Sequence, residues 1–234
     1  MSDPAYVVPF EKRRFRSAAE HYLKGRPAYA GALFERVALL ANLGRDDAVL
    51  DLGCGPGQIA LGFTPYAGQV TAIDPEPEML RIAAAAAEAA GRSIRFIEGS
   101  SFDLTPALGT FRLVAIGRAF HWMDRQDTLA RLDRMIAPGG AIALFSDKHP
   151  DLPQNAWRKV YNTVLDKYSV EDSARKLRKS NGFGNHETVL LASPFSHLER
   201  IGVIEARRTP IEDFDSRLLS LSSVSRDRIG DQAD

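Results

Sequence analysis

The sequence predicts an α/β protein with a doubly wound, mostly parallel sheet, and three observations support this fold class. Five short aliphatic runs show almost no polar alternation, as is typical of strands covered on both faces. Longer helical patterns separate these runs, so right-handed crossovers would join the strands. The chain has 234 residues, of which 44% are hydrophobic, and this favours one large folded domain.

The predicted strands and helices alternate from residue 48 onward. The strands are AVLDLG (48–53), QVTAID (69–74), SIRFIE (93–98), FRLVAIG (111–117) and GAIALFS (140–146). The helices between them are expected over 58–63, 76–90 and 125–136. Gly91 ends the second helix, and Pro138, Gly139 and Gly140 stop the third.

Further elements flank this core. Two amphipathic helices, 14–23 and 31–42, precede it, and Gly44 is placed to cap the second. After the fifth strand, helical patterns over 155–168 and 172–179 indicate an insertion. A sixth strand is expected within 197–209 and a helix over 214–224, and no seventh strand is seen.

The composition argues against several classes of protein. Thirty Lys and Arg balance thirty Asp and Glu, so no positive excess favours nucleic acid or an anionic membrane. Cys54, the single cysteine, allows no internal disulfide and is expected to be a small buried filler. No uncharged apolar run has the length of a membrane span or an export signal. We therefore expect a cytoplasmic protein without nucleic-acid or membrane partners, and we expect the basic run 175–179 to be a solvated helix face.

The loop after the first strand carries the clearest chemical signal. In DLGCGPG, residues 51–57, glycines at alternate positions let the backbone turn tightly and approach a ligand. The spacing G-x-G-x-G differs from the G-x-G-x-x-G of dinucleotide sites, and Asp51 would repel a pyrophosphate. A carboxylate here instead suits S-adenosylmethionine, which has no phosphate and presents an ammonium and a sulfonium group.

Asp74 is the second candidate at this edge of the sheet. It ends the second predicted strand, where an acidic side chain can accept both hydroxyls of a ribose. A structural role is the alternative, because Asp-Pro is also a good start for the helix 76–90.

Five motifs carry a family resemblance that covers nearly the whole chain. VLDLGCGPGQ, AIDPEPEML, FIEGSSFDL, AFHWMD and IAPGGAIAL resemble, in order and spacing, the class I S-adenosylmethionine-dependent methyltransferases. YLKGRPAY (22–29) together with AFHW (119–122) is similar to a small-molecule branch of that class, methyltransferase type 11. The resemblance implies a Rossmann-like sheet, S-adenosylmethionine as cofactor and methyl transfer to a small organic acceptor.

The resemblance also implies a single domain with four parts. These are an N-terminal helical cap (1–45), a cofactor-binding core (46–150), a helical lid insertion (151–196) and a C-terminal sheet segment (197–234). The family usually ends in an antiparallel strand pair, so this last segment is expected to be incomplete. A second copy of the chain is one way to cover the sheet edge that this would leave.

The resemblance assigns a role to each cofactor-binding position. The glycine loop faces the methionine part, Asp74 accepts the ribose, and the strand-four tip approaches the methionine through main-chain groups. Phe102 stands where the family frequently has an acid, so stacking or backbone recognition of adenine is expected there. Arg26 would pair with the cofactor's carboxylate or, alternatively, form a surface ion pair. The full set is Tyr22, Arg26, Asp51, Gly53, Gly55, Gly57, Asp74, Pro75, Met79, Ser101, Phe102, Gly117 and Arg118.

His121 is the candidate catalytic base, because it directly follows the fourth strand. The alternative is that it packs under the cofactor loop. His149 is expected in a solvated loop, and Trp157, Phe15 and Trp122 are candidates for an acceptor pocket or for plain core. No two histidines or acids are spaced like a metal site, so no metal is expected.

Two other functions remain open at this point. One is a cofactor-binding module without catalysis, and the other is a dinucleotide-dependent oxidoreductase, against which the glycine spacing argues.

Overall fold

The computed structural model describes residues 7–11, 13–195 and 197–233. Its centre is a sheet with the strand order β3-β2-β1-β4-β5, and all neighbouring strands are parallel. The strands are β1 (Ala48–Leu52), β2 (Gln69–Asp74), β3 (Arg95–Glu98), β4 (Phe111–Gly117) and β5 (Ile136–Phe145). The winding direction reverses between β1 and β4, so the crevice for a ligand is expected at their carboxyl ends. The predicted fold class is confirmed.

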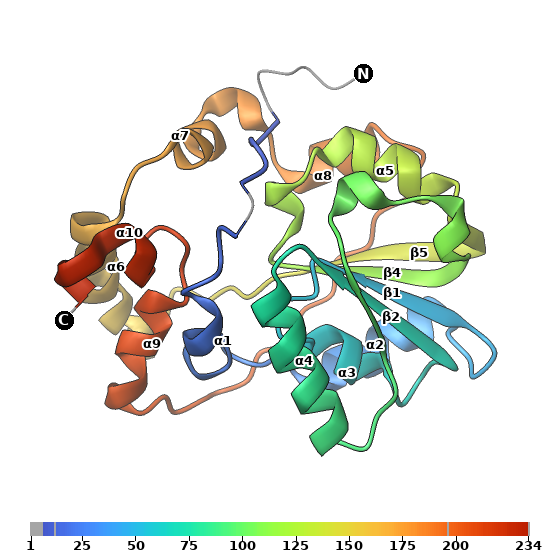
Figure 1. Cartoon of the computed structure of the whole chain (residues 1–234), viewed down its shortest axis with the longest axis horizontal. Coiled ribbons are helices and arrows are strands. Elements are labelled where there is room, and N and C mark those ends of the chain that lie inside the picture. Colours follow the sequence, from blue (N-terminus) through green and yellow to red (C-terminus); the bar gives the residue numbers. More distant parts are fainter. Residues whose placement is uncertain (1–6, 12, 196, 234) are drawn as a thin grey trace.

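Helices cover both faces of this sheet (Figure 1). On one face lie α2 (Gly31–Leu40), α3 (Gln58–Phe63) and α4 (Pro77–Ala89), and on the other lie α5 (Arg125–Asp133) and α8 (His186–Leu191). Leu113 and Ala115 of β4 pack in the cluster that contains α2 and α3, whereas Val114 and Ile116 pack in the cluster that contains α5 and α8. Two buried faces explain why aliphatic residues occupy consecutive positions in β4 and do not alternate with polar ones.

A second group of helices lies to the left of the sheet in Figure 1. It consists of α1 (Ala19–Gly25), α6 (Trp157–Tyr168), α7 (Ser173–Lys179), α9 (Phe214–Leu219) and α10 (Arg226–Ile229). Single 3-10 turns occur at Ser101–Asp103, Pro106–Leu108, Phe120–Trp122, Pro153–Asn155, Asn181–Phe183, Ile211–Asp213 and Gly230–Ala233. Gly25 brings α1 against the backbone of α9, because a Cβ atom there would overlap the carbonyl oxygen of Ser216.

The predicted helix over 125–136 is three residues too long. The helix ends at Asp133, and β5 begins at Ile136, before the Pro138-Gly139-Gly140 sequence that was expected to separate the two. This sequence is tolerated inside β5 because β5 is an edge strand with a register shift opposite Phe111 and Leu113. Gly139 takes a φ of 71°, and the side chain of Arg112 donates to the carbonyl of Pro138 at 2.9 Å.

The sixth strand expected within 197–209 is absent from the described residues of that segment. The segment is largely exposed, with Ile204 at 82%, and its charged side chains form local ion pairs such as Arg207–Glu205 at 2.6 Å. A segment with so few apolar side chains to bury gains little from joining the sheet.

Three helix ends also differ from prediction. The predicted helix 14–23 begins only at Ala19, and the predicted helix 214–224 ends at Leu219. Gly44 does not cap the helix 31–42, because Asn42 takes the left-handed φ of 47° instead. The main-chain N–H of Gly44 donates to the Asp47 carboxylate at 2.8 Å and so belongs to the turn before β1.

The segment before α1 is held by arginines against three other elements. Arg13 pairs with Glu76 at 3.1 Å, Arg14 pairs with Asp172 at the start of α7, and Arg16 pairs with Asp227 of α10 at 3.2 Å. Val8 packs with Ala174 and Phe183 in a small separate cluster. The N-terminal segment therefore lies across the edge of the sheet at which a ligand is expected.

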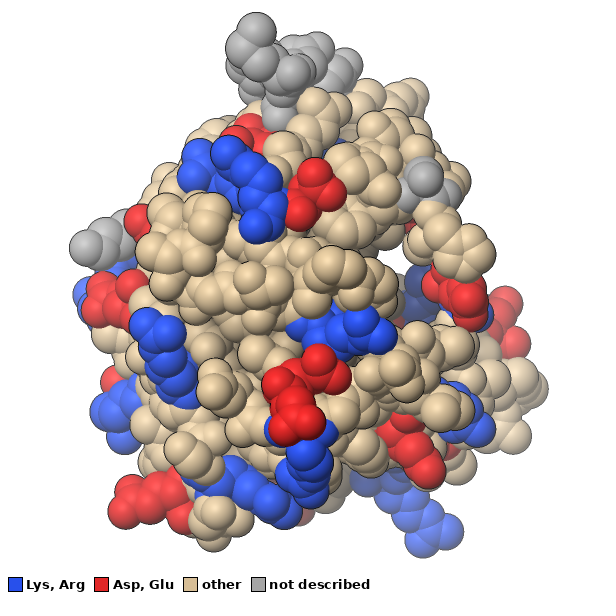
Figure 2. All heavy atoms as spheres, turned by 90° about the vertical axis from the view of Figure 1, so that its right-hand side faces the viewer, with Lys and Arg blue, Asp and Glu red and all other residues tan. Residues whose placement is uncertain are grey.

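Two general properties of the molecule are the distribution of charge on its surface and the length and hydropathy of its helices. On the face shown in Figure 2, acidic and basic side chains are interspersed without a continuous area of one sign. Among the described residues, none of the helices combines the length and the hydropathy that crossing a bilayer requires.

Candidate active site

The loop after β1 is built on glycines in the left-handed region. Gly53, Gly55 and Gly57 have φ values of 70°, 52° and 79°. The main-chain N–H groups of Gly53 and Cys54 donate to the carbonyl of Ile73 at 2.8 and 3.0 Å, which ties the loop to β2. A Cβ atom on Gly57 would lie 2.9 Å from Ala83, but one on Gly55 would meet only the Met79 sulfur, at 4.0 Å. The loop therefore leaves open space above Gly55.

Asp51 lies at the base of this loop with one carboxylate oxygen unused. It is completely buried, and its Oδ2 accepts a hydrogen bond from the main-chain N–H of Ala60 in α3 at 2.8 Å. Its Oδ1 has no hydrogen-bond partner among the described residues. Burial, with a smaller contribution from the charge of Asp74, raises the pKa of Asp51 to about 7. A buried, unpartnered oxygen of this kind fits a cationic hydrogen-bond donor from a ligand.

Asp74, at the end of β2, holds the loop in place. One carboxylate oxygen accepts from the N–H of Gly55 at 2.8 Å, and the other accepts from the N–H of Glu76 at 2.9 Å. Burial raises its pKa to about 6, although both hydrogen bonds oppose the rise. The helix-start role is thus present in the structure, and each oxygen retains a further lone pair for a ligand hydroxyl.

Glu76 is a residue that the sequence reasoning missed. It is buried, it pairs with Arg13, and its Oε2 has no hydrogen-bond partner among the described residues. The sequence did contain a signal for this residue, because Glu76 is acidic and lies only two positions after Asp74, at the carboxyl end of β2.

A small cavity above the loop brings six of the predicted residues together. It has a volume of about 20 Å³, and it lies between the loop after β1 and the tip of β4. The predicted residues that line it are Tyr22, Asp51, Gly53, Gly55, Gly117 and Arg118. Gly57, Asp74, Pro75 and Met79 do not line it and instead lie around the loop and the start of α4.

Comparison with known proteins decides the family. A family described as "Methyltransferase domain" matches residues 49–140, which contain the glycine loop, β2, β3 and β4, most of β1 and the first half of β5. An uncharacterized methyltransferase of Mycobacterium bovis is 30% identical over 80% of this chain and 67% of its own length. The chain belongs to the class I S-adenosylmethionine-dependent methyltransferases.

A second relative agrees with this assignment, and a solved structure agrees with the fold. A malonyl-acyl-carrier-protein O-methyltransferase of Enterobacter lignolyticus is 32% identical over 68% of this chain and 64% of its own length. The structure of a putative type II methyltransferase of Anaeromyxobacter dehalogenans has the same fold, with a TM-score of 0.56, 23% identity and 89% and 84% of the two chains covered. The chain spans between about half and two thirds of the length of the first curated relatives that it matches.

The cofactor of this methyltransferase is S-adenosylmethionine, and the loop geometry fits it. The unpartnered Oδ1 of Asp51 suits the ammonium group, and the open space above Gly55 allows close approach of a ligand to the backbone. Ser101 and Phe102, expected beside adenine, lie in the turn after β3. Ser101 is buried, whereas Phe102 is 44% exposed and has Phe10 of the N-terminal segment edge-on at 6.1 Å.

Arg118 connects the small cavity of the methyltransferase to its surroundings. It takes a positive φ of 54° at the tip of β4. Its Nε donates to Asp147 at 2.6 Å, its Nη2 donates to the carbonyl of Pro27 at 2.8 Å, and its guanidinium lies 4.5 Å from the Tyr29 ring centre. Burial alone would raise the pKa of Asp147, but Arg118 holds that pKa below its ordinary value.

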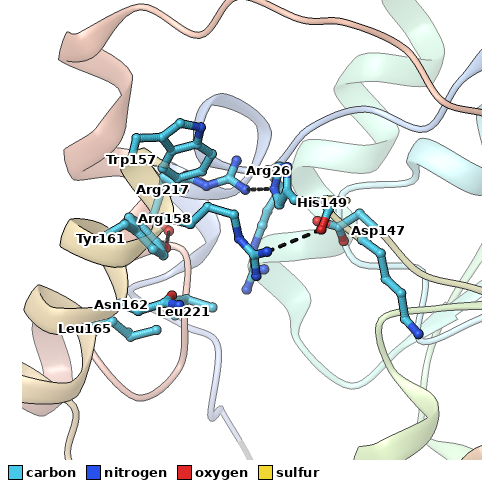
Figure 3. Close-up of a pocket in the computed structure, with 11 residues that line it drawn as sticks. Arg26, Asp147, His149, Trp157, Arg158, Tyr161, Asn162, Leu165, Arg217 and Leu221 are labelled. Carbon is cyan, nitrogen blue, oxygen red and sulfur yellow. Dashed lines mark hydrogen bonds between the residues drawn. The ribbon is translucent and has the colours of Figure 1, made fainter. Parts of the chain in front are cut away.

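A larger cavity of about 470 Å³ has Asp147, the partner of Arg118, in its wall (Figure 3). It lies between the segment after β5 and the helices α1, α6 and α9, and its lining residues include Arg26, Asp147, His149, Trp157 and Arg217. Arg26, expected to contact the cofactor, lines this cavity and not the smaller one. His149, expected in a solvated loop, is likewise part of its wall.

Of the three candidate aromatic residues, only Trp157 lines this larger cavity. Trp122 and Phe15 lie edge-to-face at 5.6 Å elsewhere. Arg14 and Arg178 lie over the Trp122 ring at 4.4 and 4.1 Å. The predicted solvated basic face is therefore wrong for Arg178, because α7 turns this arginine inward.

His121 lies in the 3-10 turn after β4, packed on Trp122 at 4.9 Å and near His186 at 6.4 Å between ring centres. Burial, with a smaller contribution from the charge of Arg178, lowers its pKa to about 3. The imidazole is therefore neutral near pH 7, and its basicity is poorly matched to proton removal there. This arrangement supports the packing role over the role of base.

Cys54 and possible metal ligands were the remaining candidates for chemistry at this site. Cys54 is buried, its thiol donates to the carbonyl of Gly55 at 3.5 Å, and burial raises its pKa. In the described part of the chain, no three His, Cys, Asp or Glu residues come close enough to hold a metal ion.

Proposed function

We propose that this methyltransferase transfers a methyl group from S-adenosylmethionine to a small organic acceptor in the larger cavity. The observation that carries the proposal is the position of that cavity. Asp147 in its wall is paired with Arg118, which lines the small cavity at the glycine loop. An acceptor would therefore lie directly beside the cofactor position. When bound, S-adenosylmethionine supplies an activated methyl group on a sulfonium.

The residues of this chain contribute orientation and exclusion of water. Asp51, Asp74 and the glycine loop fix one reactant, and the walls formed by α1, α6 and α9 fix the other. The N-terminal segment, held by Arg13 and Arg14, covers the edge between them. A titrating base is not required if the acceptor atom is already a nucleophile.

The test is methyl release measured against a panel of small acceptors, together with calorimetric binding of S-adenosylmethionine. The proposal expects saturable cofactor binding and transfer to at least one member of the panel. Binding without transfer to any member would leave a cofactor-binding module as the function. Absence of binding to a folded sample would contradict both.

A further inference from the structure

The larger cavity is strongly cationic. Arg26, Lys148, Arg158 and Arg217 line it, and Asp147 is the one carboxylate among the described lining residues. Asp147 is already neutralised by Arg118, 2.6 Å away. The volume of about 470 Å³ is within the range of small-molecule sites. The cavity therefore presents uncompensated positive charge to any occupant.

The guanidinium groups of this cavity have hydrogen-bond donors to spare. Arg217 donates to Nε2 of His149 at 2.8 Å, and Arg158 donates to the carbonyl of His149 at 3.3 Å (Figure 3). Among the described residues, no carboxylate lies within ion-pair distance of either arginine. The buried Nε of Arg26 has no hydrogen-bond partner there either. Because a guanidinium has five N–H donors, each of these groups can bind an anion without losing its present contacts.

One wall of the cavity is apolar and aromatic. Trp157, Tyr161 and Leu165 of α6 face Leu221, and Arg217 lies 5.4 Å from the Trp157 ring centre and 5.8 Å from that of Tyr161. The Arg217 guanidinium therefore lies beside two aromatic rings whose planes are 79° apart, and this packing restricts its freedom to move. A ligand that fits this cavity combines an apolar body with an anionic group.

We propose that the acceptor is an organic carboxylate whose apolar body lies against Trp157 and Tyr161 and whose carboxylate is bound by Arg158 and Arg217. The inference rests on the proposed function, of which it names the acceptor class. A planar carboxylate matches the fork of a guanidinium in a two-bond arrangement. Tyr22 in the small cavity and Arg26 in the larger one are in contact, with 5.5 Å from the Arg26 guanidinium to the Tyr22 ring, so a ligand held here lies beside the cofactor position.

The test is a titration of the full chain, saturated with the demethylated cofactor, with three probes that share one apolar body. The probes are 1-naphthylacetate, its neutral amide and 1-naphthyl phosphate. Binding is followed by the quenching of tryptophan fluorescence. The chain has two tryptophans, and the Trp157→Phe variant shows how much of the change in fluorescence comes from Trp157, which lines the cavity. We expect the carboxylate to bind at least about tenfold more tightly than the amide, the loss that follows from removing charge-assisted hydrogen bonds.

Substitutions locate the site and separate it from the cofactor site. Arg158→Gln and Arg217→Gln are each expected to weaken carboxylate binding about tenfold and to leave the affinity for the demethylated cofactor unchanged. Arg217→Lys guards against a folding defect in Arg217→Gln, since it retains the charge and is expected to retain part of the binding. Arg92→Gln, which replaces an exposed arginine after the C-terminal end of α4, is the control and should change nothing.

Four results would overturn the proposal. They are equal binding of amide and carboxylate, tighter binding of the phosphate, no binding of any carboxylate, and loss of cofactor affinity in Arg158→Gln and Arg217→Gln. The last would mean that the cavity receives the carboxylate of the cofactor itself. If the demethylated cofactor does not bind at all, the proposed function fails. A titration with the three probes in the absence of cofactor then still shows whether the cavity binds a carboxylate.

Discussion

At the scale of single residues, Asp51 and Asp74 place two buried carboxyl groups under one glycine loop. Burial raises their pKa values to about 7 and about 6, against ordinary values near 4. In the folded chain without ligand, both groups therefore hold protons that the unfolded chain has lost above about pH 4. Their contribution to the free energy of unfolding falls as pH rises through this window.

Asp51→Asn tests whether this contribution to stability falls as pH rises. The amide keeps an oxygen for the N–H of Ala60 but never ionises, so the variant escapes the unfavourable burial of charge. We expect the variant to gain stability relative to the wild type as pH rises from about 5 to 8. Urea denaturation of both proteins at the two pH values measures the difference. A constant difference would contradict the raised pKa.

The same residue predicts the pH dependence of cofactor binding. An ammonium group is bound by the ionised carboxylate, so the affinity for S-adenosylmethionine should fall as pH falls below about 7. Asp51→Asn should bind about tenfold more weakly at pH 8 and show a flatter pH profile. Calorimetry at a series of pH values tests both expectations, and an unchanged affinity in the variant would remove Asp51 from the site.

His121→Ala distinguishes packing from base catalysis. Because the pKa of His121 is about 3, this residue does not titrate near pH 6.5. We therefore expect the pH-rate profiles of the wild type and the variant to have the same shape in that range. We expect instead a loss of stability of about 1–3 kcal/mol from the vacated contacts with Trp122. Thermal melts and pH-rate profiles of both proteins provide the readout. A large drop in turnover with unchanged melting temperature would favour the base.

At the scale of elements, the sequence predicted the strands better than their surroundings. A continuous aliphatic run identifies a strand that is buried on both faces, and this prediction is confirmed for β1, β2 and β4. It is wrong for β3, an edge strand that begins at Arg95 and has no fully buried residue. The edge strand β5 was predicted too short, because a proline and two glycines that stop a helix are also tolerated in an edge strand with a register shift. The sixth strand expected within 197–209 is not formed by the described residues of that segment, whose charged side chains pair with one another in solvent.

The contact between α1 and α9 provides a test at this scale. Gly25→Ala would place a methyl group on the carbonyl of Ser216, so the two helices must separate. We expect a loss of about 1–3 kcal/mol or more in the free energy of unfolding, with reduced binding in the larger cavity that both helices help to form. Gly31→Ala is the matched control, since a Cβ atom there meets nothing within 4 Å. Equal stability of the two variants in urea would show that α1 does not pack on α9 in this way.

At the scale of the whole molecule, the two halves of the candidate site differ in how far sequence could predict them. The glycine loop and Asp74 come from neighbouring strand ends, and parallel strands bring these ends to one edge. The larger cavity instead combines Arg26, Asp147, Trp157 and Arg217. These residues come from three separate parts of the chain and meet only through the packing of α1, α6 and α9. The helical patterns predict these helices individually but do not predict which of them pack together. Its positive charge is therefore a property of the folded chain alone.

Calorimetric titration of the full chain with S-adenosylmethionine shows whether the loop over Asp51 binds this cofactor. We expect saturable binding of one molecule per chain, about tenfold weaker in Asp74→Ala, with no competition from NADH. A sample that melts cooperatively, yet gives no binding heat with the cofactor or with its demethylated product at several temperatures, would contradict the account.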